Sequence, residues 1–67
     1  MLFTDVWYNI GYIYTIFGDL DMASEAFRLA LNYMPDNIEA LNNMGVIEYE
    51  KGNIESAINY GEKSFRE

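Results

Sequence analysis

Apolar residues recur at helical spacing in the first third of the chain. Successive members of the first run lie one or three positions apart, which is typical of a helix: Val6, Trp7, Ile10, Ile13, Tyr14 and Phe17. Gly18 ends this run. A second helix is predicted from about Leu20 up to Pro35, because proline disfavours a helical conformation in the residue before it. Its apolar side is predicted to comprise Met22, Ala23, Ala26, Phe27, Ala30 and Leu31.

The same pattern continues in the second half of the chain. A third helix is predicted to open at Ile38 and to close at Gly52, and a fourth runs from Ile54 to the chain end. Short glycine- or proline-containing turns join consecutive helices, so neighbours are expected to be antiparallel. The sequence therefore predicts an all-α fold.

The two halves are related by an offset of 34 positions. Gly11 and Gly18 recur as Gly45 and Gly52, and Ala23 recurs as Ala57. The first glycine of each pair is expected to let two helices approach closely, and the second to supply the left-handed backbone of a tight turn. In the first hairpin, Trp7, Tyr14 and Phe27 are expected to fill the remaining space.

Composition narrows the chemistry that the chain can perform. No cysteine or histidine is present among the 67 residues, which removes thiolate and imidazole groups from catalysis and metal binding. Glu48 and Glu50 are too close in sequence to face each other on a helix, and Asp19 is expected to bond the backbone of its turn. We therefore predict no catalytic residues, no metal site and no cofactor.

Charge indicates the kind of partner. The net charge is −7, from 11 acidic and 4 scattered basic residues, so neither nucleic acid nor an anionic membrane surface is an expected partner. No apolar run is long enough to cross a bilayer, so no direct membrane insertion is expected. A protein or peptide segment that is amphipathic or mildly basic is the expected partner, and the lack of cysteine fits a cytoplasmic location.

These features resemble the tetratricopeptide repeat (TPR) family, whose helix–turn–helix pattern is W-x₂-L-G-x₂-Y…A-x₃-F…P. The first repeat, residues 4–35, carries that pattern as Trp7, Ile10, Gly11, Tyr14, Ala23, Phe27, Ala30 and Pro35. The second, residues 38–67, keeps Leu41, Met44, Gly45 and Ala57 but has Glu48, Gly61 and Ser64 where tyrosine, phenylalanine and alanine are usual. The resemblance implies a non-catalytic α-solenoid scaffold for protein binding.

A narrower resemblance lies in "WYNIG", "FRLAL" and "EALNNMGVIEYEKGNIESA". These strings are similar to the late repeats of the Bardet–Biedl syndrome 8 family, TPR subunits of the BBSome, a ciliary trafficking coat. Glu48 is the distinctive position. This resemblance implies a cilium or basal-body location and a role among the subunits of a coat.

In TPR proteins the first helix of each repeat lines a concave face that holds ligands. By register, the resemblance assigns to this face Asp5, Tyr8, Tyr12, Thr15 and Ile16, and Glu39, Asn42, Val46, Tyr49 and Glu50. Alternatively, Tyr8, Tyr12 and Tyr49 only pack between repeats. The carboxylate-binding clamp of chaperone-tail TPRs is not expected, because tyrosines replace its lysine and asparagine and the acidic residues would repel a carboxylate.

The apolar first helix would be covered on both sides in a longer array, and two repeats are fewer than such arrays usually need. We therefore expect this chain to form homo-oligomers, by stacking of repeat ends or by a helix swap at the Gly18 or Pro35 hinge. The sequence leaves this choice open.

Overall fold

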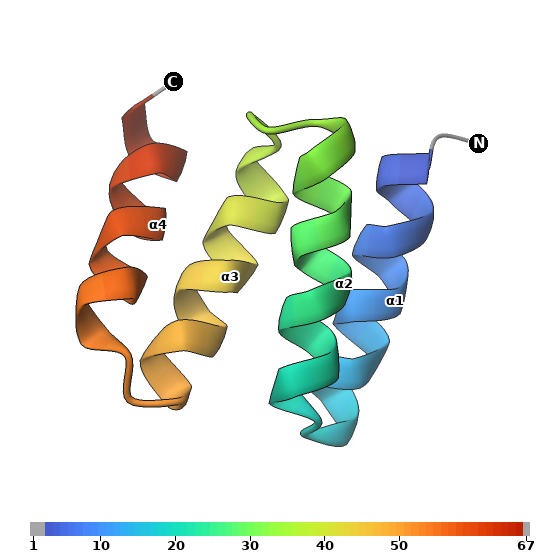
Figure 1. Cartoon of the computed structure of the whole chain (residues 1–67), viewed down its shortest axis with the longest axis horizontal. Helices are drawn as coiled ribbons and strands as arrows, with labels where there is room; N and C mark the ends of the chain where they lie inside the picture. The colour runs from blue at the N-terminus through green and yellow to red at the C-terminus, as the bar shows by residue number, and fades with distance from the viewer. Residues whose placement is uncertain (1–2, 67) are drawn as a thin grey trace.

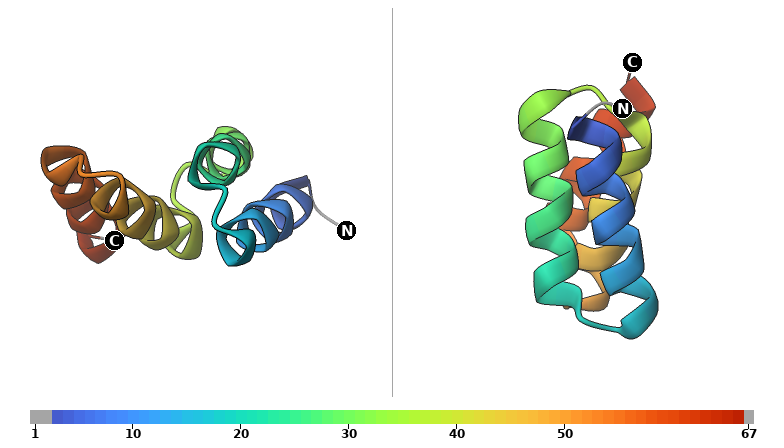
Figure 2. Two further views of the ribbon diagram at one scale, coloured as in Figure 1. Left: turned by 90° about the horizontal axis from the view of Figure 1, so that it is seen from below. Right: turned by 90° about the vertical axis from the view of Figure 1, so that its right-hand side faces the viewer.

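The computed structural model describes residues 3–66 and consists of four helices (Figure 1). They are α1 (Phe3–Phe17), α2 (Leu20–Tyr33), α3 (Ile38–Glu50) and α4 (Ile54–Arg66). Consecutive helices run in opposite directions, so that α1 with α2 and α3 with α4 form two helical hairpins (Figures 1 and 2). The all-α prediction is confirmed. The last residue of the predicted second repeat, Glu67, lies outside the described residues.

Short polar segments end one helix and begin the next. Gly18 and Gly52 adopt φ angles of 82° and 90°, the left-handed region predicted for both. Asp19 caps α2, where its side chain accepts a hydrogen bond from the backbone N–H of Met22 at 3.2 Å. Asn37 caps α3 in the same way, through the N–H of Ala40 at 2.8 Å. The turn chemistry read from the sequence is thus present in the structure.

The core lies between the two hairpins, where α2 meets α3. One cluster of fully or almost fully buried side chains joins the two helices: Ala23, Phe27, Ala30, Ala40, Met44 and Ile47. Trp7 and Tyr14 of α1 pack against it, as predicted. The two hairpins therefore share this buried cluster.

Gly11 makes the closest approach within the first hairpin. A Cβ atom added at Gly11 would lie 3.0 Å from three atoms of the Phe27 ring. That ring is fully buried, and the edge-to-face contact with Tyr8 places the two ring centroids 5.5 Å apart. The predicted packing role of Gly11 is correct.

Gly45 differs from its counterpart Gly11. The position equivalent to Phe27 in the second hairpin is Gly61, which has no ring to press against Gly45. A Cβ at Gly45 would meet the Ala57 carbonyl oxygen at 3.5 Å, an ordinary contact. The second hairpin therefore does not need its first glycine for tight packing, and that part of the prediction was wrong.

The prediction of the apolar side of α2 was also wrong at one residue, Met22. Met22 is 45% exposed, whereas Ser24 is buried and its hydroxyl donates to the Asp21 carbonyl at 2.9 Å. Met22 and Ser24 each lie about one helical step of 100° from Ala23, on opposite sides. Periodicity alone does not say which of these two flanks the neighbouring helices cover.

Candidate protein-binding surface

The residues assigned from the sequence to the ligand-holding face lie on α1 and α3. We call them together the inner face: Asp5, Tyr8, Tyr12, Thr15, Ile16, Glu39, Asn42, Val46, Tyr49 and Glu50. Four of its large apolar side chains are more than half exposed: Tyr12 at 52%, Ile16 at 66%, Val46 at 53% and Tyr49 at 66%. Asp5, Glu39 and Glu50 are exposed as well. The inner face thus combines exposed apolar groups with carboxylates.

Tyr8 is the inner-face residue most clearly engaged within the fold. Its ring packs on Phe27, and its hydroxyl accepts a hydrogen bond from the Asn43 side-chain amide at 3.2 Å. Asn43 also donates to the Glu39 carbonyl at 2.9 Å. Tyr8 therefore joins α1 to α3, as the packing alternative predicted.

Two other inner-face residues also bond within the chain. The Thr15 hydroxyl donates to the Gly11 carbonyl, one turn earlier, at 2.8 Å. The Ser64 hydroxyl lies 3.2 Å from the Asn42 side-chain oxygen and 3.0 Å from the Gly61 carbonyl, and it can donate to either. Thr15 is thereby oriented by its own helix, and Asn42 lies beside α4.

A groove of about 340 Å³ lies between α3 and α4. We call it the α3–α4 groove, and its lining residues are Asn42, Gly45, Val46, Tyr49, Glu50, Ala57 and Gly61. It brings together four inner-face residues that the sequence assigned to the ligand-holding face: Asn42, Val46, Tyr49 and Glu50. The α1 candidates and Glu39 do not line it.

The α4 side of the groove was not among the sequence candidates. Ala57 and Gly61 form it, and both are small residues on the side of α4 that faces α3. The signal was present in the sequence, because Gly61 stands where the repeat pattern has phenylalanine. Because Gly61 has no aromatic ring and Gly45 on the facing helix is also small, space remains between α3 and α4. The groove occupies that space.

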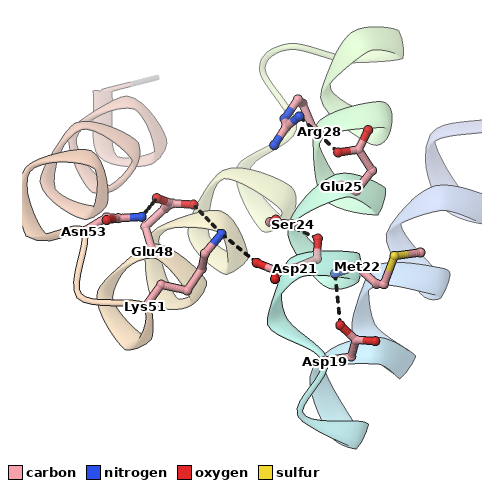
Figure 3. Close-up of polar contacts among 9 residues, drawn as sticks. All are labelled: Asp19, Asp21, Met22, Ser24, Glu25, Arg28, Glu48, Lys51 and Asn53. Carbon is pink, nitrogen blue, oxygen red and sulfur yellow. Dashed lines mark hydrogen bonds and ion pairs between the residues drawn. The ribbon is translucent and has the colours of Figure 1, made fainter.

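Glu48, the unusual residue of the second repeat, has a structural role (Figure 3). Its side chain is almost buried, accepts a hydrogen bond from the Asn53 amide at 2.9 Å and lies 3.9 Å from the Lys51 ammonium. The same ammonium lies 3.4 Å from a carboxylate oxygen of Asp21. Glu48 thus connects the end of α3 to the next turn and, through Lys51, to the start of α2.

Comparison with known families identifies the repeat. The sequence profile of the tetratricopeptide repeat matches residues 4–37 and 38–66. The chain belongs to the tetratricopeptide repeat family. Two hairpins, each of two antiparallel helices, agree with this assignment. Repeats of this family form a scaffold for protein–protein interaction.

Several relatives have TPR names. The chain is 47% identical over 53 residues to tetratricopeptide repeat protein 8 of Caenorhabditis elegans and 45% identical over 53 residues to that of Homo sapiens. Both alignments cover 79% of this chain and 10% of the relative. Tetratricopeptide repeat protein 8 is the protein of the Bardet–Biedl syndrome 8 family. Similarity to these relatives therefore confirms the narrower resemblance noted from the sequence.

A further relative is the photosystem I assembly protein Ycf3 of Cyanophora paradoxa, which is 42% identical over 60 residues. That alignment covers 90% of this chain and 34% of the relative. The chain therefore spans about a tenth to a third of the length of these relatives. In the part of the chain that the structure describes, no helix is long and apolar enough to cross a membrane.

Proposed function

We propose that the inner face binds a protein segment that is amphipathic and basic, with no catalytic step. The observation that carries this proposal is the exposure of Tyr12, Val46 and Tyr49 beside carboxylates on the same pair of helices. Apolar and aromatic groups supply most of the binding energy in protein interfaces, and exposed charges on the rim supply orientation and association rate. Acidic groups at the rim favour lysine and arginine in the partner.

A helix or extended segment would make two kinds of contact with this surface. Its apolar side chains would contact Tyr12, Val46 and Tyr49, while its basic side chains would lie near Asp5 and Glu39. The peptide-recognition modes of other helical scaffolds follow this division between apolar anchors and charged flanks. Tyr8 is not included among these contacts, because it is engaged with Phe27 and Asn43.

The test is an affinity measurement with a defined probe. We would titrate the chain into a fluorescent 18-residue amphipathic helical peptide of leucine and lysine, and into its leucine–glutamate equivalent, and follow anisotropy. The lysine peptide is expected to bind, and the glutamate peptide is expected not to bind. Tyr12→Ala with Tyr49→Ala is expected to weaken binding by about tenfold or more, the loss of about 1.4 kcal/mol or more.

Charge-matched variants separate site binding from general attraction to an acidic chain. Glu39→Gln with Glu50→Gln removes two inner-face charges, and Glu25→Gln with Glu62→Gln removes two exposed charges on α2 and α4. The first pair should weaken binding of the lysine peptide more than the second. Equal effects of the two pairs would show that net charge alone attracts the peptide, and the inner-face proposal would be wrong.

A second candidate function is assembly. Ile13 on α1 is 51% exposed, although its counterpart in the second repeat, Ile47, is 1% exposed in the core. Such uncovered repeat surfaces support a chain that packs against further repeats, whether of other copies or of fellow subunits in a coat. From the Bardet–Biedl syndrome 8 resemblance we propose a ciliary trafficking coat in the cytoplasm, cilium or basal body as the setting.

A further inference from the structure

The structure contains one example of a helix docked on a TPR hairpin. Helix α3 packs against the first hairpin, with Met44 and Ile47 each 1% exposed in one cluster with Phe27 and Ala23, which are fully buried. The bond from Asn43 to the Tyr8 hydroxyl crosses the same junction. In this chain, the surface of the first hairpin is thus covered by the first helix of the second hairpin.

The second hairpin has the equivalent groove without a helix on it. The counterparts of Ala23 and Phe27, 34 positions on, are Ala57 and Gly61. Ala57 is only half-buried and Gly61 is exposed, and both line the α3–α4 groove. The surface that α3 covers in the first hairpin is therefore open in the second.

The helix equivalent to α3 is α1, and its docking side is also uncovered. Ile10 and Ile13 stand where α3 has Met44 and Ile47. Ile13 is 51% exposed against 1% for Ile47. In Figures 1 and 2, α1 and α4 lie at opposite ends of the row of helices, so the two uncovered surfaces are at opposite ends of one chain.

Both surfaces also differ in side-chain volume from their counterparts at the junction of α2 and α3. The α3–α4 groove lacks the phenylalanine ring that the first groove has, because Gly61 replaces Phe27. Helix α1 has the larger Val6 where α3 has Ala40, which is fully buried.

We propose that a second copy of this chain docks its α1 in the α3–α4 groove, as α3 docks on the first hairpin. The inference rests on the assembly candidate above and selects end-to-end stacking over a helix swap. The contact joins two different surfaces, so it is heterologous and can extend the row of helices from copy to copy. The net charge of −7 on each copy opposes the contact, so association should strengthen as salt screens that repulsion.

Stacking of this kind leaves the part of the inner face on α1 accessible. Tyr12 and Ile16 remain 52% and 66% exposed although α3 is docked beside them. Val46, Tyr49 and Glu50 line the α3–α4 groove, so a docked copy covers part of the inner face on α3. Because stacking and peptide binding share these residues, peptide binding is tested on a variant that does not stack.

The test uses two charge-matched pairs of variants, with mass measured by light scattering over a range of protein and salt concentrations. Ile13→Asp places a charge on the docking side of α1, and Ile16→Asp is its control, since the counterpart of Ile16 is the exposed Glu50. Gly61→Glu places a charge in the groove, where a Cβ meets nothing within 4 Å, and also improves helix propensity. Asn59→Glu is its control, since its counterpart Glu25 is exposed. Circular dichroism checks that each variant folds.

The wild-type mass is expected to rise above 7.8 kDa with protein and salt concentration. Ile13→Asp and Gly61→Glu should each weaken association by about tenfold to a hundredfold, because each prevents burial of one large apolar contact. The two control variants should behave as the wild type. A mixture of Ile13→Asp and Gly61→Glu should form a one-to-one dimer that grows no further, since only one intact pair of surfaces remains.

The proposal is overturned if the wild type stays at 7.8 kDa up to about 1 mM in high salt. It is also overturned if the controls weaken association as much as their partners, or if the mixture of the two variants fails to dimerise. The anisotropy titration, repeated on Ile13→Asp, reports on the inner face independently. A wild-type chain that stays at 7.8 kDa, together with an Ile13→Asp variant that binds the peptide, would refute stacking alone.

Discussion

The contact between Gly11 and Phe27 allows a sharp prediction for Gly11→Ala. The added methyl group would lie 3.0 Å from three atoms of the Phe27 ring, closer than carbon atoms normally approach. The ring is fully buried and held edge-on by Tyr8, so it cannot move aside without displacing a second aromatic ring. The substitution therefore forces the first hairpin apart or strains the ring.

Two opposing free-energy terms determine the size of the effect. Overpacking of a well-packed core costs about 1–3 kcal/mol. Replacing glycine by alanine within a helix contributes about 1 kcal/mol in the other direction. Gly11→Ala is thus expected to lower the free energy of unfolding by up to about 2 kcal/mol, out of about 3–10 kcal/mol for a domain of this length.

Gly45→Ala is the matched control, because it makes the same chemical change at the equivalent position of the second repeat. Its methyl group would meet other atoms at 3.5 Å or more, so only the helix-propensity gain of about 1 kcal/mol should remain. The expected difference between the two variants is about 1–3 kcal/mol. Urea unfolding followed by circular dichroism at fixed protein concentration measures both.

A double substitution locates the cause of the loss. Phe27→Leu removes the ring atoms that the methyl group would meet, so Gly11→Ala should cost less in the Phe27→Leu background than in the wild type. If Gly11→Ala were as stabilising as Gly45→Ala, the close-packing account of the first hairpin would be refuted.

Substitutions at four further positions test other contacts by the same unfolding measurement. Gly18→Ala should lower stability by about 1–2 kcal/mol, because its φ of 82° disfavours a residue with a Cβ, and Gly18→Asn should cost less. Glu48→Ala should cost about 0.5–1.5 kcal/mol, since it removes the acceptor of the Asn53 amide, whereas Asp21→Asn should cost less, since the Asp21 side chain is 89% exposed. Asn37→Ala should cost about 1 kcal/mol through loss of the α3 cap. A Glu48→Ala variant no less stable than Asp21→Asn would contradict the structural role given to Glu48.

The sequence was sufficient for the helices and their ends. Glycine and proline positions act locally, through the backbone angles that they permit, and so Gly18, Gly52 and Pro35 could be interpreted without knowledge of tertiary contacts. The 34-residue offset then placed Gly11 against the second helix. The structure confirms that contact, since the Phe27 ring occupies the space beside Gly11.

The sequence could not decide which candidate side chains the fold itself uses. Tyr8 and Tyr12 have the same chemistry and lie one helical turn apart, yet only Tyr8 has Phe27 and Asn43 within reach. That difference arises where α1 meets α3, at a contact between Tyr8 and Asn43, which are 35 positions apart in the sequence. Glu48 shows the same limit, because its unusual identity was visible but its partners were not.

The groove was missed for a related reason. Gly61 was recorded as a departure from the repeat pattern, but an absent side chain has consequences only where its neighbours are small as well. Gly45 and Ala57 are both small, and the groove results from the three residues together. Space between helices depends on such combinations of residues from different elements.

The most direct test of the central claim, that the inner face binds protein, is nuclear magnetic resonance mapping of the contact surface. Amide spectra of the ¹⁵N-labelled chain would first be recorded in a dilution series, to fix the shifts of the monomer, and then during titration with the leucine–lysine peptide. The account expects the largest changes on α1 and α3 around Tyr12, Val46 and Tyr49. Changes concentrated on the exposed sides of α2 and α4, or no changes at saturating peptide, would contradict it.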